Sequence, residues 1–206
     1  MKILYTGFMP FGGETTNPSF EAVRLLPDSI AGAAVIRLEI PTVFDRCGET
    51  LLEALRREKP DAVICVGQAG GRNCVTPEFV AINYRHARIP DNEGHQPLDE
   101  RLCPDGPDAC FSTLPVRRIV ARCREAGIPA AVSYTAGTYV CNELMYTLLH
   151  AAREEFPELV GGFIHVPYST AQAAAKDVPP PCMELSVMAE ALRIAGEAAI
   201  GAVTWK

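Results

Sequence analysis

Short apolar runs rich in Val and Ile alternate along the chain with longer stretches in which apolar residues recur every three or four positions. The first kind of run is typical of buried strands, and the second is typical of amphipathic helices. We predict strands at residues 2–6, 34–39, 62–66, 130–133 and 162–165, and helices at about 18–26, 44–58, 114–126, 140–155 and 184–199. This alternation predicts an α/β fold with a mostly parallel central sheet between two layers of helices.

The segment between about 85 and 113 does not follow this pattern. Prolines and glycines recur in it, among them Pro90, Gly94 and Pro104, and they make a continuous helix or strand improbable. A connection of this length in a compact domain is usually functional or mobile. Because no repeat or shift in composition divides the chain, we predict a single domain over residues 1–206 that contains this long loop.

The balance of charge limits the partners that the chain can bind. Its 206 residues include 25 acidic and 19 basic side chains, which gives a formal net charge of −6. Nucleic-acid binders need clustered Lys and Arg to displace counterions, so we expect no nucleic-acid partner. The longest stretches without charge, 126–142 and 159–175, contain Pro, Gly, Ser and Thr and are too short to cross a bilayer. We therefore expect no membrane partner.

Eight cysteines are spread over the chain without a Cys-x-x-Cys pair. This spacing does not support a zinc ribbon or a thioredoxin-like motif. The first residues change to Gly and Pro after three or four apolar positions, which is too short for the core of an export signal. We therefore expect a cytoplasmic protein with free thiols.

Cys141 differs from the other cysteines in its setting. It lies one turn into a predicted helix that begins after Gly137-Thr138. The dipole and the free N–H groups of a helix start favour a thiolate and can hold an oxyanion. The alternative is that Cys141 is a buried packing residue, which is the commoner role of a free cysteine.

His165 is the histidine that could activate this thiol, because it ends a predicted apolar strand. If 130–133, the following helix and 162–165 form a βαβ unit, the helix start and the strand end lie at the same edge of the sheet. A Cys–His pair also needs a third group to orient the imidazole. Glu78, Asp91 and Glu93 are all candidates, and the local sequence does not choose between them.

Two glycine-containing loops follow strands but lack the spacing of nucleotide-binding motifs. Their glycines let backbone amides approach a small ligand, and Phe8 and Phe11 would supply apolar walls. Two other interpretations remain open. In one, Gly70-Gly71-Arg72 holds a phosphate in a nucleoside phosphorylase or hydrolase; in the other, the chain binds small amides or peptide ends without catalysis.

The chain resembles the type I pyroglutamyl peptidases, a family of cysteine peptidases. The matching blocks occur in the family's order: Thr6-Gly7-Phe8 with Pro10-Phe11-Gly12-Gly13, Gly70-Gly71-Arg72 through Thr76-Pro77-Glu78, Ala87-Arg88-Ile89-Pro90-Asp91-Asn92, Val140-Cys141-Asn142, and Phe163-Ile164-His165-Val166-Pro167. Together they cover most of the chain. The departures from the family pattern include Met9, Phe79, Tyr134 and Tyr139.

The resemblance implies Cys141 as nucleophile, His165 as general base and Glu78 as the orienting carboxylate. It also implies a lactam pocket lined by Phe8, Phe11, Thr42, Ile89, Tyr139 and Val140, with Gln68 near the polar edge of the lactam. The implied activity is that of an omega peptidase, which hydrolyses the bond after an N-terminal pyroglutamyl residue of a peptide through a thioacyl-enzyme. The implied protein is a cytoplasmic three-layer α/β/α domain of the phosphorylase/hydrolase-like type, without metal or cofactor, assembled into dimers or tetramers.

Overall fold

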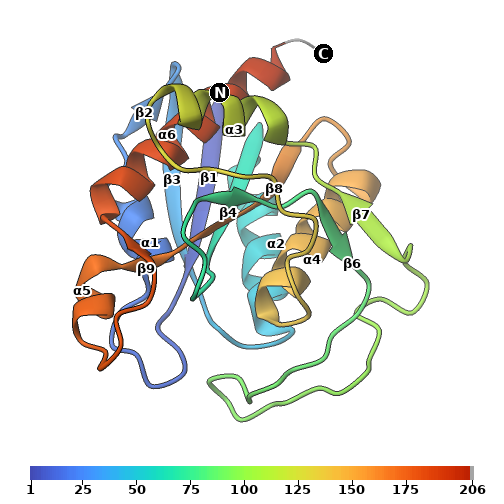
Figure 1. The fold of residues 1–206 in the computed structure, drawn as a ribbon. Helices are drawn as coiled ribbons and strands as arrows, with labels where there is room; N and C mark the ends of the chain where they lie inside the picture. The colour runs from blue at the N-terminus through green and yellow to red at the C-terminus, as the bar shows by residue number, and fades with distance from the viewer. Residues whose placement is uncertain (205–206) are drawn as a thin grey trace.

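A six-stranded sheet with the order β2-β3-β1-β4-β8-β5 forms the centre of the computed structural model, which describes residues 1–204 (Figure 1). Its four inner strands, β3 (Ala33–Ile40), β1 (Lys2–Phe8), β4 (Ala62–Gln68) and β8 (Val160–Val166), are parallel. The two-residue strands β2 (Ser29–Ile30) and β5 (Thr76–Pro77) pair antiparallel at the two edges. The predicted mostly parallel sheet is confirmed.

Helices cover both faces of this sheet. One layer contains α1 (Pro18–Arg24), α3 (Val116–Glu125) and α6 (Leu185–Val203), and the other contains α2 (Arg46–Glu58) and α4 (Val140–Glu154). Because successive side chains of a strand point to opposite faces, Ile3 and Tyr5 of β1 join the first layer and Leu4 joins the second. All five predicted helices are present, with ends that differ by a few residues.

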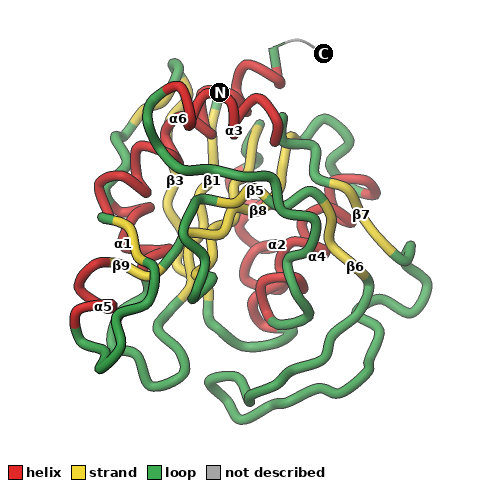
Figure 2. The backbone as a smooth tube through the Cα atoms, viewed as in Figure 1, coloured by secondary structure: helices red, strands yellow, loops and turns green. Residues whose placement is uncertain are grey.

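Two short strand pairings lie outside the central sheet. Strands β6 (Val80–Ile82) and β7 (Ala109–Phe111) pair antiparallel, and β9 (Tyr168–Ser169) pairs with β10 (Cys182–Met183) beside the short helix α5 (Thr170–Ala174). Residues 83–108 between β6 and β7 form no helix or strand, as Figure 2 shows, and carry one isolated bridge between Arg85 and Glu100. The predicted irregular segment is therefore largely confirmed, although β7 lies inside it.

The predicted strand at 130–133 is wrong. Ala130 and Ser133 form only isolated bridges, to Val75 and Glu78. The backbone bonds from Ala131 to Val75 and from Ser133 to Pro77 are present at 3.0 Å, but Pro77 has no N–H to return one. The ladder is thus interrupted, and β5 takes the place beside β8.

No helix within residues 1–204 is long and apolar enough to span a membrane.

Candidate active site

His165, near the end of β8, is hydrogen-bonded to Glu78 across the edge of the sheet. The Nδ1 atom of His165 lies 2.7 Å from Oε1 of Glu78, and both side chains are buried. The Glu78 N–H donates to the Phe163 carbonyl at 2.9 Å, so the backbone of β8 fixes the segment that carries this carboxylate. Since Nδ1 is occupied, Nε2 is the imidazole nitrogen available for proton exchange.

Cys141, the second residue of α4, lies against the backbone of β4. A Cβ atom added to Gly67 would come within 3.0 Å of the Cys141 sulfur and within 2.7 Å of the Phe163 ring. Gly67 is the register partner of His165 in the neighbouring strand. The glycine therefore makes room for the thiol next to the strand position that carries the imidazole.

Burial controls the charge states of these groups. It raises the pKa of Cys141 to about 12, and the nearby Glu78 carboxylate adds to this while Arg72 opposes it. Burial also lowers the pKa of His165, against the opposing effect of Glu78. Burial of Glu78 raises its pKa, but the bond with His165 and further partners outweigh this, so the pKa lies below its usual value. The directions of these shifts favour the thiol at Cys141, the neutral imidazole at His165 and the carboxylate at Glu78, whereas the helix start alone predicts a thiolate.

Arg72, which one of the two rival interpretations placed on a phosphate, lies beside Glu78. Its Nη1 atom lies 2.7 Å from Oε1 of Glu78 and 2.5 Å from the Thr76 hydroxyl, and Nη2 donates to the Thr135 carbonyl at 3.3 Å. The guanidinium is thus committed to the carboxylate that contacts His165 rather than presented to a phosphate. The local signal that could have placed Arg72 at the site is its position directly after the glycines that follow strand β4.

The two competing carboxylates have other partners. Asp91 accepts hydrogen bonds from the N–H groups of Phe44, Glu93 and His95, all at 2.9 Å. The side chain of Glu93 pairs with Arg46 at 2.5 Å. Among Glu78, Asp91 and Glu93, the carboxylate hydrogen-bonded to His165 is Glu78.

The expected pocket residues fall into two groups. Phe11, Ile89 and Tyr139 line a cavity of about 300 Å³ together with His86, Arg88, Gly137 and Thr138. The remaining candidates lie outside this lining. Phe8 and Val140 are buried in the core, Thr42 donates to the Met9 carbonyl at 2.8 Å, and Gln68 accepts from the Gln172 amide at 3.0 Å.

Two phenylalanines that the sequence did not single out for the site pack against its expected residues. The Phe163 ring lies between Phe8, at a centroid distance of 6.4 Å, and His165, at 4.8 Å. The Phe44 ring packs edge-on against Tyr139 at 5.2 Å. Phe163 adjoins His165 in the same predicted strand, but Phe44 is about a hundred residues from Tyr139, and no local pattern links the two.

Comparisons with known proteins agree on one family. The family model for pyroglutamyl peptidase matches residues 1–202. The pyrrolidone-carboxylate peptidase of Enterococcus faecalis is 55% identical over 176 residues, which cover 85% of this chain and 83% of that protein. The corresponding protein of Bacillus subtilis is 53% identical over 195 residues, which cover 94% of this chain and 90% of that protein.

Solved structures give the same result. The crystal structure of pyroglutamyl peptidase I from Bacillus amyloliquefaciens has a TM-score of 0.93 at 49% identity and covers 97% of both chains. The pyrrolidone carboxyl peptidase of Thermococcus litoralis has a TM-score of 0.93 at 39% identity, covering 97% of this chain and 93% of that one. The chain therefore belongs to the pyroglutamyl peptidase family of cysteine peptidases.

Proposed function

We propose that Cys141, His165 and Glu78 hydrolyse the bond after an N-terminal pyroglutamyl residue in this member of the pyroglutamyl peptidase family. The observation that carries the proposal is the 2.7 Å bond between His165 Nδ1 and Glu78 Oε1. The position of the Cys141 sulfur, against the strand residue paired with His165, supports it. A nucleophile, a base and a group that orients the base are the parts that this chemistry needs.

The charge states determine the order of proton transfers. Neutral His165 takes the proton of the Cys141 thiol as the sulfur attacks the scissile carbonyl, and N–H groups at the start of α4 stabilise the oxyanion. The carbon–nitrogen bond then breaks, and the imidazolium returns the proton to the leaving amine. In the second half, His165 takes a proton from water, the resulting hydroxide attacks the thioester, and the sulfur leaves and regains its proton.

Glu78 orients the base without reacting. Its carboxylate holds the Nδ1 proton of His165 and stabilises the imidazolium that forms during each half-reaction. Arg72 keeps Glu78 in position through the 2.7 Å contact with the same oxygen. The triad thus depends on a fourth side chain for its geometry.

We assign the lactam to the pocket residues implied by the resemblance: Phe8, Phe11, Thr42, Gln68, Ile89, Tyr139 and Val140. A pyroglutamyl terminus carries a neutral lactam in place of an ammonium group, so it suits apolar walls with few polar partners. The cavity between Phe11, Ile89 and Tyr139 has no carboxylate in its lining. An N-terminal proline lacks the lactam oxygen and leaves polar groups of such a site unpaired, so it should be a poor substrate.

We also propose that the single domain acts as a homo-oligomer, a dimer or tetramer, in the cytoplasm and without a cofactor. All eight cysteines are unpaired, as expected of a protein in a reducing compartment. No cluster of His, Cys, Asp and Glu with the geometry of a metal site occurs within residues 1–204. Sedimentation of the purified chain tests the assembly.

The release of a chromogenic amine from a pyroglutamyl amide tests the activity. Release should be lost after treatment with iodoacetamide, and equally lost in Cys141→Ala. Cys182→Ala is the matched control, because Cys182 is the exposed cysteine among the eight and lies in β10. A phosphorylase would be indifferent to alkylation, and a passive binder would hold the amide without releasing amine; either result would overturn the proposal.

A further inference from the structure

The turn before α2 has a strained backbone. Asp45 has φ 60° and ψ −51°, and the Arg46 N–H donates to the Phe44 carbonyl at 2.6 Å. This is a γ-turn with positive φ at its central residue, a rare conformation. A non-glycine residue keeps such a conformation only where the surrounding structure holds it in place.

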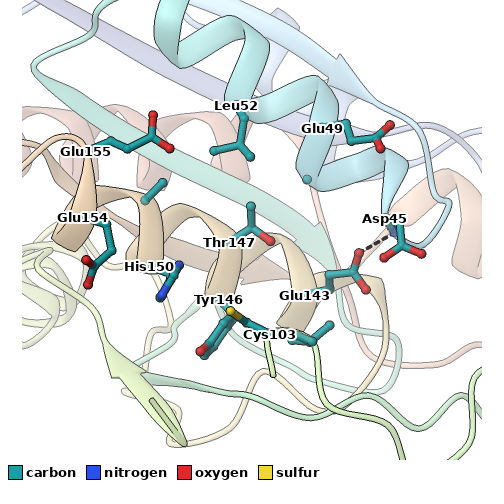
Figure 3. Close-up of a pocket in the computed structure, with 13 residues that line it drawn as sticks. Asp45, Glu49, Leu52, Cys103, Glu143, Tyr146, Thr147, His150, Glu154 and Glu155 are labelled. Carbon is teal, nitrogen blue, oxygen red and sulfur yellow. Dashed lines mark hydrogen bonds between the residues drawn. The ribbon is translucent and has the colours of Figure 1, made fainter. Parts of the chain in front are cut away.

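Glu143 of α4, which lines the same cavity as Asp45, holds this turn by direct contact. Its Oε1 atom accepts a hydrogen bond from the Asp45 N–H at 2.5 Å, as Figure 3 shows, and also lies 3.7 Å from the Cys47 sulfur. Its Oε2 atom lies 3.4 Å from Nη1 of Arg85. The Glu143 side chain is only 4% exposed, so these contacts replace nearly all of its hydration.

Arg85 extends the contact to the long connection 83–108. Its guanidinium lies 2.7 Å from Asp45 and 3.0 Å from Glu100. The backbones of Arg85 and Glu100 also exchange hydrogen bonds of 2.8 and 3.1 Å. The buried carboxylate of Glu143 therefore contacts the strained turn directly and, through Arg85, both sides of the long connection 83–108.

The turn determines the position of Phe44, the residue just before Asp45. The Phe44 N–H donates to Asp91 at 2.9 Å, and its ring packs edge-on against Tyr139 at 5.2 Å. Tyr139 in turn packs 6.3 Å from Phe11, on the cavity that Ile89 also lines. A continuous series of contacts thus links Glu143 to Phe44 and Tyr139, the aromatic wall of the candidate pocket.

We propose that Glu143 is a positioning residue for substrate binding, which acts through the Asp45 turn and Arg85 on the Phe44–Tyr139 wall. The proposal rests on the proposed function of that pocket. Glu143 follows Cys141 by two helical positions, or about 200° around the helix axis, so it points away from the face that carries the thiol. It therefore affects binding of the pyroglutamyl group rather than the chemical step.

The pKa of Glu143 distinguishes a positioning role from a role in stabilising the fold. It raises the pKa of Glu143, although the Asp45 N–H and Arg85 oppose this. For an acid with a raised folded-state pKa, the unfolded chain loses its proton first as the pH rises, so ionisation destabilises the fold near neutral pH. Replacement by the neutral Gln should therefore not lower the melting temperature, while it weakens the contact with Arg85.

The test compares Glu143→Leu, Glu143→Gln and the control Glu49→Gln, which removes a charge from the same cavity at an exposed position. For each we measure kcat, KM and thermal unfolding with a chromogenic pyroglutamyl amide. Glu143→Leu leaves the Asp45 N–H unpaired, so KM should rise about tenfold while kcat changes by less than about twofold. Glu143→Gln retains an acceptor and should restore most of the KM. Glu49→Gln should match the wild type.

The same substitutions in a Cys141→Ala background separate this proposal from the proposed function. Calorimetry then gives Kd for the uncleaved amide, which should rise in parallel with KM. A wild-type chain without turnover would overturn the peptidase proposal alone. An unchanged Kd in Glu143→Leu, or a loss of kcat at unchanged KM, would overturn the role of Glu143. If Glu143→Leu does not fold, Arg85→Gln replaces it, and an unchanged Kd there would have the same meaning.

Discussion

His165 and Glu78 come from segments 87 residues apart and are joined by a hydrogen bond of 2.7 Å between Nδ1 and Oε1. The bond is buried and is flanked by Arg72 on the carboxylate side. Its role should be visible in Glu78→Gln, because an amide can donate to Nδ1 and so stabilise the wrong tautomer. We expect kcat to fall by at least about a hundredfold at nearly unchanged KM, but less than in Cys141→Ala. An unaffected rate would assign the orienting role to another carboxylate.

The pH dependence of kcat/KM should have a limb set by His165. Since burial lowers the pKa of this imidazole below its usual 6.5, activity should persist as the pH falls through 6.5 and decline only below it. The same shift affects stability: the unfolded chain binds the proton first, so the free energy of unfolding falls as the pH drops below 6.5. A rate profile with a midpoint above 6.5 would contradict the assignment.

Alkylation should distinguish a resting thiol from a resting thiolate. Because burial raises the pKa of Cys141 to about 12, the rate of inactivation by iodoacetamide should still increase with pH beyond the ordinary thiol pKa of about 8.5. A preformed thiolate–imidazolium pair would give a rate that is level across neutral pH. The measurement is the pseudo-first-order inactivation rate, with Cys182→Ala as the background.

Arg72→Gln should shift the acid limb toward higher pH. The guanidinium is one of the charges that lower the pKa of His165, so its removal raises that pKa. It also frees one side of Glu78, and we expect a decrease in kcat of about tenfold from the weaker orientation. Arg72→Lys keeps the charge but not the several directed bonds, so it should restore the limb more than the rate. An acid limb that does not move in Arg72→Gln would exclude electrostatic coupling between Arg72 and His165.

Gly67→Ala should impair catalysis through crowding. The new Cβ would lie 2.7 Å from the Phe163 ring and 3.0 Å from the Cys141 sulfur, so one of the two must move. Overpacking of this kind costs about 1–3 kcal/mol of stability, and kcat should fall as the thiol shifts. The control is Gly201→Ala in α6, whose Cβ meets nothing closer than 3.9 Å and should leave kcat unchanged.

The sequence predicted the elements that depend on local patterns. Helix α4 and strand β8 are present and bring Cys141 and His165 to the same end of the sheet, although the predicted βαβ unit lacks its first strand. The sequence-based prediction of a strand failed at 130–133, because pairing there depends on Pro77, which lacks an N–H and lies more than fifty residues away. The choice between Glu78, Asp91 and Glu93 was open for the same reason, because long-range pairing decides which carboxylate meets the imidazole.

Other features had no local signal at all. The positive φ of Asp45 is unusual for a residue other than glycine, and the Glu143 contact that holds it spans 98 positions. The helix start predicted a thiolate at Cys141, but the desolvation that raises the pKa of this thiol depends on how the sulfur packs against Gly67 of strand β4. These are properties of the assembled core and not of any segment.

The interrupted ladder beside β5 also bears on how the enzyme loses activity on warming. Segment 129–133 is held to the sheet edge by separate bridges, while β1 and β4 lie in the middle of the sheet. Edge segments of this kind open with a smaller free energy than the central strands, in cooperative units that exchange their amide hydrogens before global unfolding. Glu78 lies between the two regions, with a bridge to Ser133 of that segment on one side and a backbone bond to β8 on the other, while His165 lies in β8 itself. The carboxylate of the candidate triad is thus carried beside the part of the sheet that opens most readily, so we expect inactivation by heat to precede melting of the sheet.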